Sequence, residues 1–337
     1  MKQVKFYVGT DVSKEWLDMC IITQDIVLQH QRIANKVTDI RKWLKQTQKQ
    51  FGYTISDTLF AMEFTGIYNN HLLKVLQELQ AAVWLIPGIL ISSADGLQRG
   101  KSDKQDAKRI AEYALENPRK VRLWKKPRTV LEELQTLLMI REKLMTTKHQ
   151  YQTTLKEYKS YGSANTYKAV KQYSEAMLRT TLKEIDAIEK EIADLIKGDE
   201  KLNELHQYIV SVDGVGIITS ANMLVTTNEF ITIDEAKKYA CYSGVAPFKD
   251  DSGKTIKKQR VSHKANKKIK KLLHLVAMSA IRIKGEMKEY YERKIKEGKA
   301  KMSVLNAIRN KIILRVFACV NNKKCYEKKL HYSLAKP

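Results

Sequence analysis

The stretch KFYVGTD, residues 5–11, is a run of mostly apolar residues that ends at Asp11. A second such run, LFAMEFTG at residues 59–66, carries Glu63. Short apolar runs that stop at a polar turn are typical of buried strands. The pattern therefore predicts that each of these two acids follows a buried strand.

A further pair of acids lies in GKSDKQDAKRIAEYA, residues 100–114, at the start of a helical pattern. Asp103 and Asp106 are three positions apart, so both carboxylates lie on one face of the helix. With Asp11 and Glu63 they form a set of four acids. If the fold gathers the four, they make a site able to hold divalent cations against a phosphodiester. This indicates an enzyme that cuts or joins nucleic acid.

The composition favours a polyanionic partner. The 337 residues include 61 Lys and Arg against 37 Asp and Glu, a formal net charge of +24. A surplus of this size favours nucleic acid over a merely basic housekeeping role and predicts binding that weakens with salt.

The cysteines and the apolar stretches point to a cytoplasmic protein without a membrane partner. No CxxC pair occurs among Cys20, Cys241, Cys319 and Cys325, and the histidines lack zinc-ligand spacing. The N-terminus does not resemble a signal peptide, and the longest apolar stretches are too short to span a bilayer. We expect free thiols and, in a bacterial or archaeal cell, a nucleoid-associated location.

Residues 1–125 follow the order of an RNase H-like (RuvC-like) α/β domain. Three strands, a helix, a strand, a helix, a strand and a helix are expected in turn. Their ranges are 4–11, 15–24, 26–34, 37–51, 58–64, 67–80, 81–87 and 103–117. This domain would carry the four acids.

Residues 126–204 change to long helical patterns with apolar residues at heptad-like spacing. Two amphipathic helices are expected, which either form a hairpin or pair with another subunit as a coiled coil. A plain interdomain spacer is the alternative. The apolar positions are Leu131, Leu134, Leu138, Met145, Leu178, Leu182, Ile185, Ile188, Ile192 and Leu195.

Residues 205–325 are expected to form a mainly helical domain, followed by a basic tail at 326–337. Its opening segment places Gly214 and Gly216 in a tight turn between two helices, as in a helix-hairpin-helix element. Backbone amides at such a turn can hold a phosphate. An ordinary helix-helix turn explains the two glycines about as well.

A run of basic residues in this region predicts a phosphate-binding face. Apolar segments flank the run on both sides, which favours a folded domain over a disordered tail. The basic residues are Lys254, Lys257, Lys258, Arg260, Lys264, Lys267, Lys268, Lys270 and Lys271.

Several motifs resemble those of a known family. GTDVSKEWLD, MEFTGIY and GKSDKQDAKRIAE resemble the three motif blocks of the DEDD transposases of insertion-sequence family 110, which are related to Piv-type DNA invertases. SVDGVGIITS and YSGVAPFKDDSGK, with RVSHKANKKIKKLL, resemble the C-terminal part of that family. The resemblance spans nearly the whole chain.

The resemblance implies a recombinase guided by a structured bridge RNA that pairs with donor and target DNA. Asp11, Glu63, Asp103 and Asp106 would hold Mg²⁺ or Mn²⁺, and Ser252 would form a phosphoserine link to DNA. A serine hydroxyl needs a base or a metal to become a nucleophile, and no histidine lies beside Ser252 in sequence. Strand exchange needs several cleavages, so a homodimer or homotetramer is expected.

Other interpretations remain open from the sequence. Ser243 and Ser262 are neighbouring candidates for the nucleophile, and a turn serine in DDSGK is the ordinary explanation for Ser252. A Holliday-junction-resolvase-like nuclease would use the four acids and water. A Piv-type invertase would share the chemistry, and a non-catalytic nucleic-acid-binding protein would need only the basic face.

Overall fold

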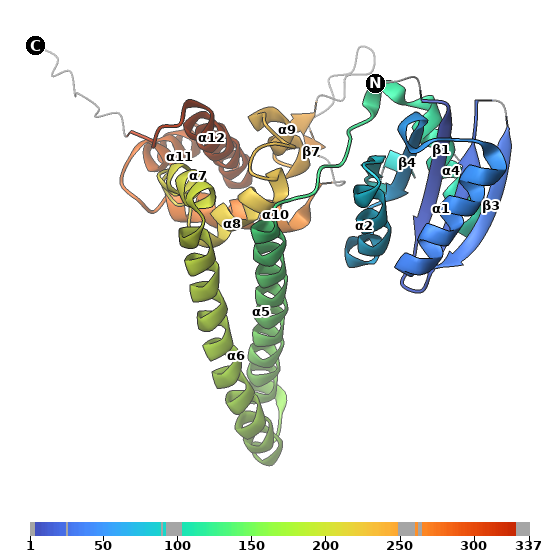
Figure 1. The fold of residues 1–337 in the computed structure, drawn as a ribbon. Coiled ribbons are helices and arrows are strands. Elements are labelled where there is room, and N and C mark those ends of the chain that lie inside the picture. The colour runs from blue at the N-terminus through green and yellow to red at the C-terminus, as the bar shows by residue number, and fades with distance from the viewer. Residues whose placement is uncertain are drawn as a thin grey trace, which may run out of the picture. The chain divides into compact units, whose positions relative to one another are not determined.

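The computed structural model describes residues 4–24, 26–88, 90–91, 103–248, 260–261 and 265–327. At residues 247, 248, 260 and 261 only the backbone is described. The chain divides into two compact units, Met1–Lys126 and Pro127–Pro337 (Figure 1). Each unit has its own hydrophobic core.

The first unit is built on a five-stranded mixed sheet in the order β3-β2-β1-β4-β5. β1, β2 and β3 are antiparallel neighbours, whereas β4 and β5 run parallel to β1. This arrangement is compatible with the expected RNase H-like domain. The strands are β1 (Phe6–Val12), β2 (Trp16–Ile22), β3 (Val27–Ala34), β4 (Thr58–Glu63) and β5 (Ala82–Ile86).

Successive strand residues point to opposite sides of the sheet, and apolar residues occupy both sides. Helices therefore cover both faces. Val8 packs in a core with residues of α1 and α2, whereas its neighbour Tyr7 packs in a second core with residues of α4. The sheet is therefore the middle layer of three. The helices are α1 (Val37–Phe51), α2 (Asn70–Glu78) and α4 (Asp103–Glu116), with short 3-10 turns at Ile55–Asp57, Gly66–Asn69 and Pro118–Lys120.

Two long helices open the second unit, α5 (Thr129–Tyr161) and α6 (Ala164–Gly198), and they pack along each other as a hairpin (Figure 1). Ser163 caps the start of α6 by accepting a hydrogen bond from the Thr166 amide at 3.3 Å. The apolar residues that recur at heptad-like spacing in these helices are buried only in part. Leu134 is fully buried, whereas Met145 is 37% exposed.

Shorter helices form the rest of the second unit and share one core with the base of the hairpin. The domain division expected at residue 204 falls inside α7. The elements are α7 (Glu200–Val210), α8 (Ile217–Thr227), α9 (Ala236–Tyr242), β6 (Pro247–Phe248), β7 (Arg260–Val261), α10 (Lys267–Ala280), α11 (Glu286–Lys296) and α12 (Lys301–Asn322). Of the expected basic tail, the structure describes only Tyr326 and Glu327.

A network of ion pairs, the Arg128 network, joins the starts of α5 and α7 to the turn after α8. Arg128 donates two hydrogen bonds of 2.8 Å to Asp199 and also pairs with Glu229, whose side chain is 1% exposed. Lys201 lies 3.1 Å from the same buried carboxylate. Every charge of the network therefore has an opposite partner.

Within the part of the chain that the structure describes, no helix combines the length and apolar character needed to cross a membrane.

Candidate catalytic site

Asp11 and Glu63 come from neighbouring parallel strands. β1 and β4 pair in a register that sets Thr10 beside Met62, and in each strand the acid is the next residue. Because the carboxyl ends of parallel strands meet at one edge of a sheet, the register brings the two acids to the same edge. Their placement follows from the strand pairing and not from their distance in sequence.

Gly9 allows α4 to pack closely against β1. A Cβ atom at Gly9 would lie 2.2 Å from the Ala107 carbonyl oxygen and 2.4 Å from the Ala111 amide nitrogen. Only a residue without a side chain allows this approach of helix to strand. The first turn of α4, which carries Asp103 and Asp106, is thereby held against the strand that carries Asp11.

A second glycine makes room for Glu63. A Cβ atom at Gly88 would lie 1.8 Å from Glu63 Oε1, so the chain just after β5 passes directly over this carboxylate. The sequence motifs did not single out Gly9 or Gly88 for these roles. Their signal was only that each glycine stands within or beside an apolar strand.

The carboxylate of Asp11 is repelled by the other acids of the site. The pKa of Asp11 is raised to about 6, first by burial and then by the negative charges of Asp106, Asp103, Asp18 and Glu63. The three other predicted acids therefore act on Asp11 through space. A cation bound among them would relieve this repulsion.

Asp18 and Arg32 are two further charged residues of the site that the sequence motifs missed as functional groups. Asp18 faces Asp11 across the β1–β2 pairing and is 4% exposed. It accepts hydrogen bonds from Arg32 at 2.9 Å and from His30 at 3.0 Å. An acid inside the apolar run of β2 is the local signal that could have pointed to Asp18, whereas the position of Arg32 opposite it comes only from the strand register.

Arginines hold both acids of α4. Arg32 Nη2 lies 2.5 Å from Asp103 Oδ2, so it bridges Asp103 to the buried Asp18. Arg109 lies 3.0 Å from Asp106. These contacts fix the two carboxylates and partly neutralise them.

The donor set suits Mg²⁺ or Mn²⁺ in chemistry, since carboxylate oxygens are the ligands that hard divalent cations prefer. In the described ranges, however, no three Asp, Glu, His or Cys side chains converge as ligands of a metal ion. The arginine contacts of Asp103 and Asp106 give a physical reason, because each arginine occupies a carboxylate oxygen that a metal would use.

The candidate nucleophile and much of the basic run lie outside the described residues; these are Ser252, Lys254, Lys257, Lys258 and Lys264. Arg260 is described as backbone in β7, where it lies opposite Phe248 of β6. Of the alternative nucleophiles, Ser243 is fully buried and donates a hydrogen bond to the Ala240 carbonyl, which makes it a poor candidate. Ser262 lies outside the described residues.

The four lysines of α10 differ in their partners. Lys268 pairs with Glu142 of α5 at 2.6 Å. Lys267, Lys270 and Lys271 form no ion pair with any described residue. The last three therefore remain available to a phosphate backbone.

The two glycines of the α7–α8 turn have different surroundings. Gly214, at φ +85°, would with a Cβ atom lie 2.8 Å from the Val276 carbonyl and 2.9 Å from the Ala280 amide, so it packs against α10. Gly216 is exposed at the start of α8, and a Cβ atom there would meet nothing. The packing of α10 thus accounts for Gly214, whereas no such packing constrains Gly216.

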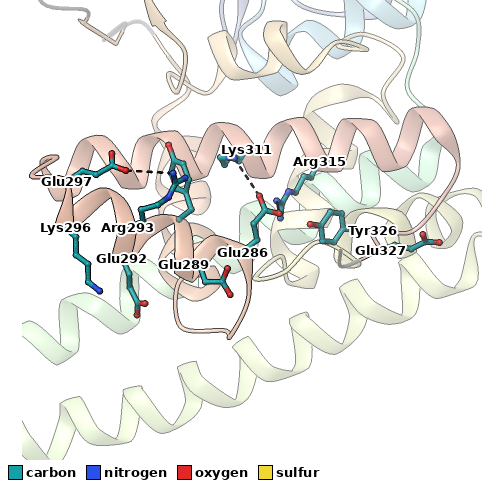
Figure 2. A pocket seen from close by; sticks show the side chains of 11 residues that line it. Glu286, Glu289, Glu292, Arg293, Lys296, Glu297, Lys311, Arg315, Tyr326 and Glu327 are labelled. Carbon is teal, nitrogen blue, oxygen red and sulfur yellow. Dashed lines mark hydrogen bonds and ion pairs between the residues drawn. The ribbon is translucent and has the colours of Figure 1, made fainter. Parts of the chain in front are cut away.

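A groove of about 1140 Å³ lies between α11 and α12, and none of the predicted site residues is part of its lining (Figure 2). Glutamates and basic residues mix in its lining, and Glu286 pairs with Arg315 at 2.5 Å and with Lys311 at 3.9 Å. Arg315 and Tyr326 also stack, with 4.7 Å from the guanidinium to the ring centre. Paired charges of both signs make this groove a poor match for a phosphate backbone.

Two family models match the chain. Residues 8–159 match a model described as a transposase of the DEDD, IS110 type, and residues 206–292 match the transposase IS116/IS110/IS902 family. The first match includes Asp11, Glu63, Asp103 and Asp106.

Individual proteins similar to this chain point to the same family. The pilin gene-inverting protein of Moraxella lacunata is 27% identical over 97% of this chain and 99% of its own length. Its counterpart in Moraxella bovis is 26% identical over the same shares. An uncharacterized 43.6 kDa protein of insertion element IS110 in Streptomyces coelicolor is 26% identical over 43% of this chain and 35% of its own length. Together with the sheet unit and its four acids, these matches support an IS110-type transposase or recombinase.

Proposed function

We propose that this protein is a bridge-RNA-guided DNA transposase that cleaves and rejoins donor and target DNA. The observation that carries the proposal is geometric: the β1–β4 register brings Asp11 and Glu63 to one edge of the sheet, and the contact of Gly9 with α4 holds the helix that carries Asp103 and Asp106 against β1. Burial, and then the negative charges of the neighbouring acids, raise the pKa of Asp11 to about 6. Such a set of carboxylates is unfavourable without a cation and useful with one beside a phosphodiester.

In the proposed reaction Ser252 Oγ attacks the phosphorus atom of a DNA backbone. The Oγ–P bond forms, the bond from phosphorus to a deoxyribose oxygen breaks, and the serine proton passes to a base while the leaving oxygen takes up a proton. Attack by a hydroxyl of another DNA strand reverses these bonds and rejoins the DNA. The energy of the broken ester is kept in the phosphoserine, so joining needs no external energy source such as a nucleotide triphosphate.

Mg²⁺ or Mn²⁺ held by Asp11, Glu63, Asp103 and Asp106 would supply a Lewis acid for the phosphate oxygens. To take part, Asp103 has to exchange its contact with Arg32, and Asp106 its contact with Arg109. The two arginines then act as placeholders that keep these carboxylates aligned before the cation binds.

The nucleic-acid partners follow from charge and from the family resemblance. A net charge of +24 suits a chain that must hold guide RNA together with two DNA duplexes. A protein that delegates sequence recognition to RNA needs mainly backbone contacts, and lysines are suited to these. We propose a dimer or tetramer as the active assembly, because exchange of two duplexes needs several cleavages.

A second candidate is a site-specific DNA invertase of the Piv type. The observation in its favour is that the two pilin gene-inverting proteins match 97% of this chain. The chemistry at Ser252 and the four acids would be the same. The difference would lie in the DNA sites and in the need for a guide RNA.

The test is a search for a covalent protein–DNA adduct. The full chain, RNA transcribed from the non-coding DNA flanking its gene, Mg²⁺ and matching DNA are incubated and separated under denaturing conditions. The expected result is an adduct in the wild type and in Ser262→Ala, and its loss in Ser252→Ala and Asp11→Asn. DNA cleavage without an adduct, unaffected by Ser252→Ala, would instead identify a nuclease that uses water.

The same assay separates the two candidate functions. Omission of the RNA should abolish the adduct of a guided transposase. An adduct that forms without RNA on DNA carrying two inverted sites would favour the invertase.

A further inference from the structure

Arg309 of α12 is a buried cation that has no counter-ion among the described residues. It is 5% exposed, and none of the described residues offers it a carboxylate. Its Nε has no hydrogen-bond partner. Arginine is almost never buried to this extent unless it is paired, because removing its charge from water is costly.

The contacts of Arg309 are to neutral groups. Nη2 lies 2.6 Å from His274 Nδ1 on α10, and Nη1 lies 3.5 Å from Asn306 Oδ1. A guanidinium can only donate, so Nδ1 of His274 must accept and the imidazole proton sits on Nε2. Burial, followed by the charge of Arg309, lowers the pKa of His274 and keeps its ring neutral. The pair thus carries one positive charge and offers only N–H donors to a further ligand.

A lysine stripe leads to this pair. Lys267, Lys270, Lys271 and His274 occupy positions i, i+3, i+4 and i+7 of α10, which form one face of a helix. Lys268, outside the stripe, is instead paired with Glu142. The stripe therefore combines unpaired lysines with a buried guanidinium at its C-terminal end.

The pair is also tied to the strands around the basic segment. Asn306, one turn before Arg309, donates to the Val245 carbonyl at 2.8 Å, two residues before β6 begins. The side chain of Asn266 caps α10, and the backbone N–H of Asn266 donates to the Tyr242 carbonyl at 2.8 Å. α12 and the start of α10 are thereby both joined to the chain just before β6.

We propose that Arg309 and His274 form a phosphate-binding site for a nucleic-acid backbone, at the inner end of the stripe Lys267–Lys270–Lys271. The planar fork of the guanidinium matches the oxygens of a phosphate, and the His274 Nε2–H adds a further donor. The bound anion supplies the negative charge that the described residues lack. The choice of nucleic acid as the source of the phosphate rests on the proposed function, whereas the site itself rests on the geometry.

The sharpest test uses the stability of the protein in the absence of nucleic acid. Arg309→Met keeps the volume and removes the buried charge, so the melting temperature should equal or exceed that of the wild type in chloride buffer. Added sulfate should raise the melting temperature of the wild type, as any ligand of the native state does, and should raise that of Arg309→Met much less. Both series are run at constant ionic strength.

A competing explanation is an ion pair inside the chain, for which Asp250 or Asp251 would be the partner. In that case Arg309→Met lowers the melting temperature by several degrees, and sulfate stabilises both proteins equally. That pair of results would overturn the proposal.

Binding to a short DNA duplex gives a second measurement. Loss of one phosphate contact should reduce the slope of log K against log salt by about 0.9. Arg309→Met and Lys271→Met are each expected to show this reduction. His274→Phe, which removes the Nε2–H at a partly exposed position, should weaken binding without a change in slope.

Lys268→Met is the matched control, since it removes a lysine of the same helix whose charge is already paired with Glu142. Its slope should stay near that of the wild type. Equal slopes for Arg309→Met and wild type would contradict the proposal even if the variant is less stable.

Neither measurement involves cleavage, so the two proposals fail separately. Sulfate stabilisation that depends on Arg309, with no adduct at Ser252, would leave the phosphate site in place and remove the proposed reaction.

Discussion

The two units of this molecule each hold uncompensated charge, of opposite sign. In the sheet unit, burial and then the like charges around it raise the pKa of Asp11 to about 6. In the helical unit, Arg309 is buried with no described acid beside it. The Arg128 network, by contrast, pairs every buried charge with an opposite one.

The contrast distinguishes charges that stabilise the fold from charges that are suited to bind a ligand. A balanced network stabilises the fold as it stands, and its loss is felt as instability. An unbalanced site costs stability until a ligand of the opposite charge arrives. In our two proposals the ligand of the sheet unit is a cation, and that of the helical unit is an anion.

Breaking the balanced network should have the largest effect on stability. Arg128→Met leaves Glu229, with its 1% exposed side chain, facing only Lys201. We expect the free energy of unfolding to fall by about 3 kcal/mol, measured by urea denaturation at neutral pH. The pKa of Asp199 is held low mainly by Arg128, so the wild-type advantage should shrink as acid protonates Asp199. A change of less than about 0.5 kcal/mol in the free energy of unfolding would show that the network does not stabilise the fold.

Gly9→Ala should have an intermediate effect, because the new methyl group overlaps the backbone of α4. We expect a loss of about 1–3 kcal/mol in thermal or urea unfolding. Adduct formation should fall by more than the stability loss explains, since the first turn of α4 with Asp103 and Asp106 has to shift. Gly52→Ala is the control: its glycine is also in the first unit, at φ +70°, but its Cβ would meet nothing. This control should lose only stability.

Asp11→Asn should have the smallest effect and the opposite sign. The folded-state pKa of Asp11 is raised, so its charge destabilises the native state above about pH 6, and protonation removes this cost as the pH falls. We expect the variant to be about 1 kcal/mol more stable at neutral pH, after allowance for solvent screening. This gain should fade as the pH falls below about 6.

Added Mg²⁺ sharpens the same prediction. It should stabilise the wild type and leave Asp11→Asn nearly unchanged in calorimetry. If the variant is less stable than wild type at neutral pH without a divalent cation, the acids do not repel one another as described.

Much of the first unit was predictable because each element has its own period or boundary. The run ending at Asp11 became β1, and the segment starting at Asp103 became α4. In the second unit the apolar spacing indicated long helices but left open whether they pair with each other or with another chain. Their hairpin was settled by a short connection at Gly162 and Ser163.

The site was predictable only in part. Runs of apolar residues that end in an acid mark Asp11 and Glu63 as candidates, and the joint arrangement with Asp103 and Asp106 favours a functional role. Asp18 and Arg32 gave no such sign, because their roles come from the pairing of β1, β2 and β3. A strand register is a long-range property that no local pattern encodes.

The sequence by itself determined the four acids, the basic surplus and the order of elements, because composition and periodicity are local. Only the tertiary structure decided which charges are balanced. Lys268 and Lys271 look alike in sequence, yet one meets Glu142 and the other meets no described acid. Arg309 lies in an ordinary helical pattern, and its isolation appears only when α12 is packed against α10. Charge balance depends on contacts between distant segments, and these exist only in the folded chain.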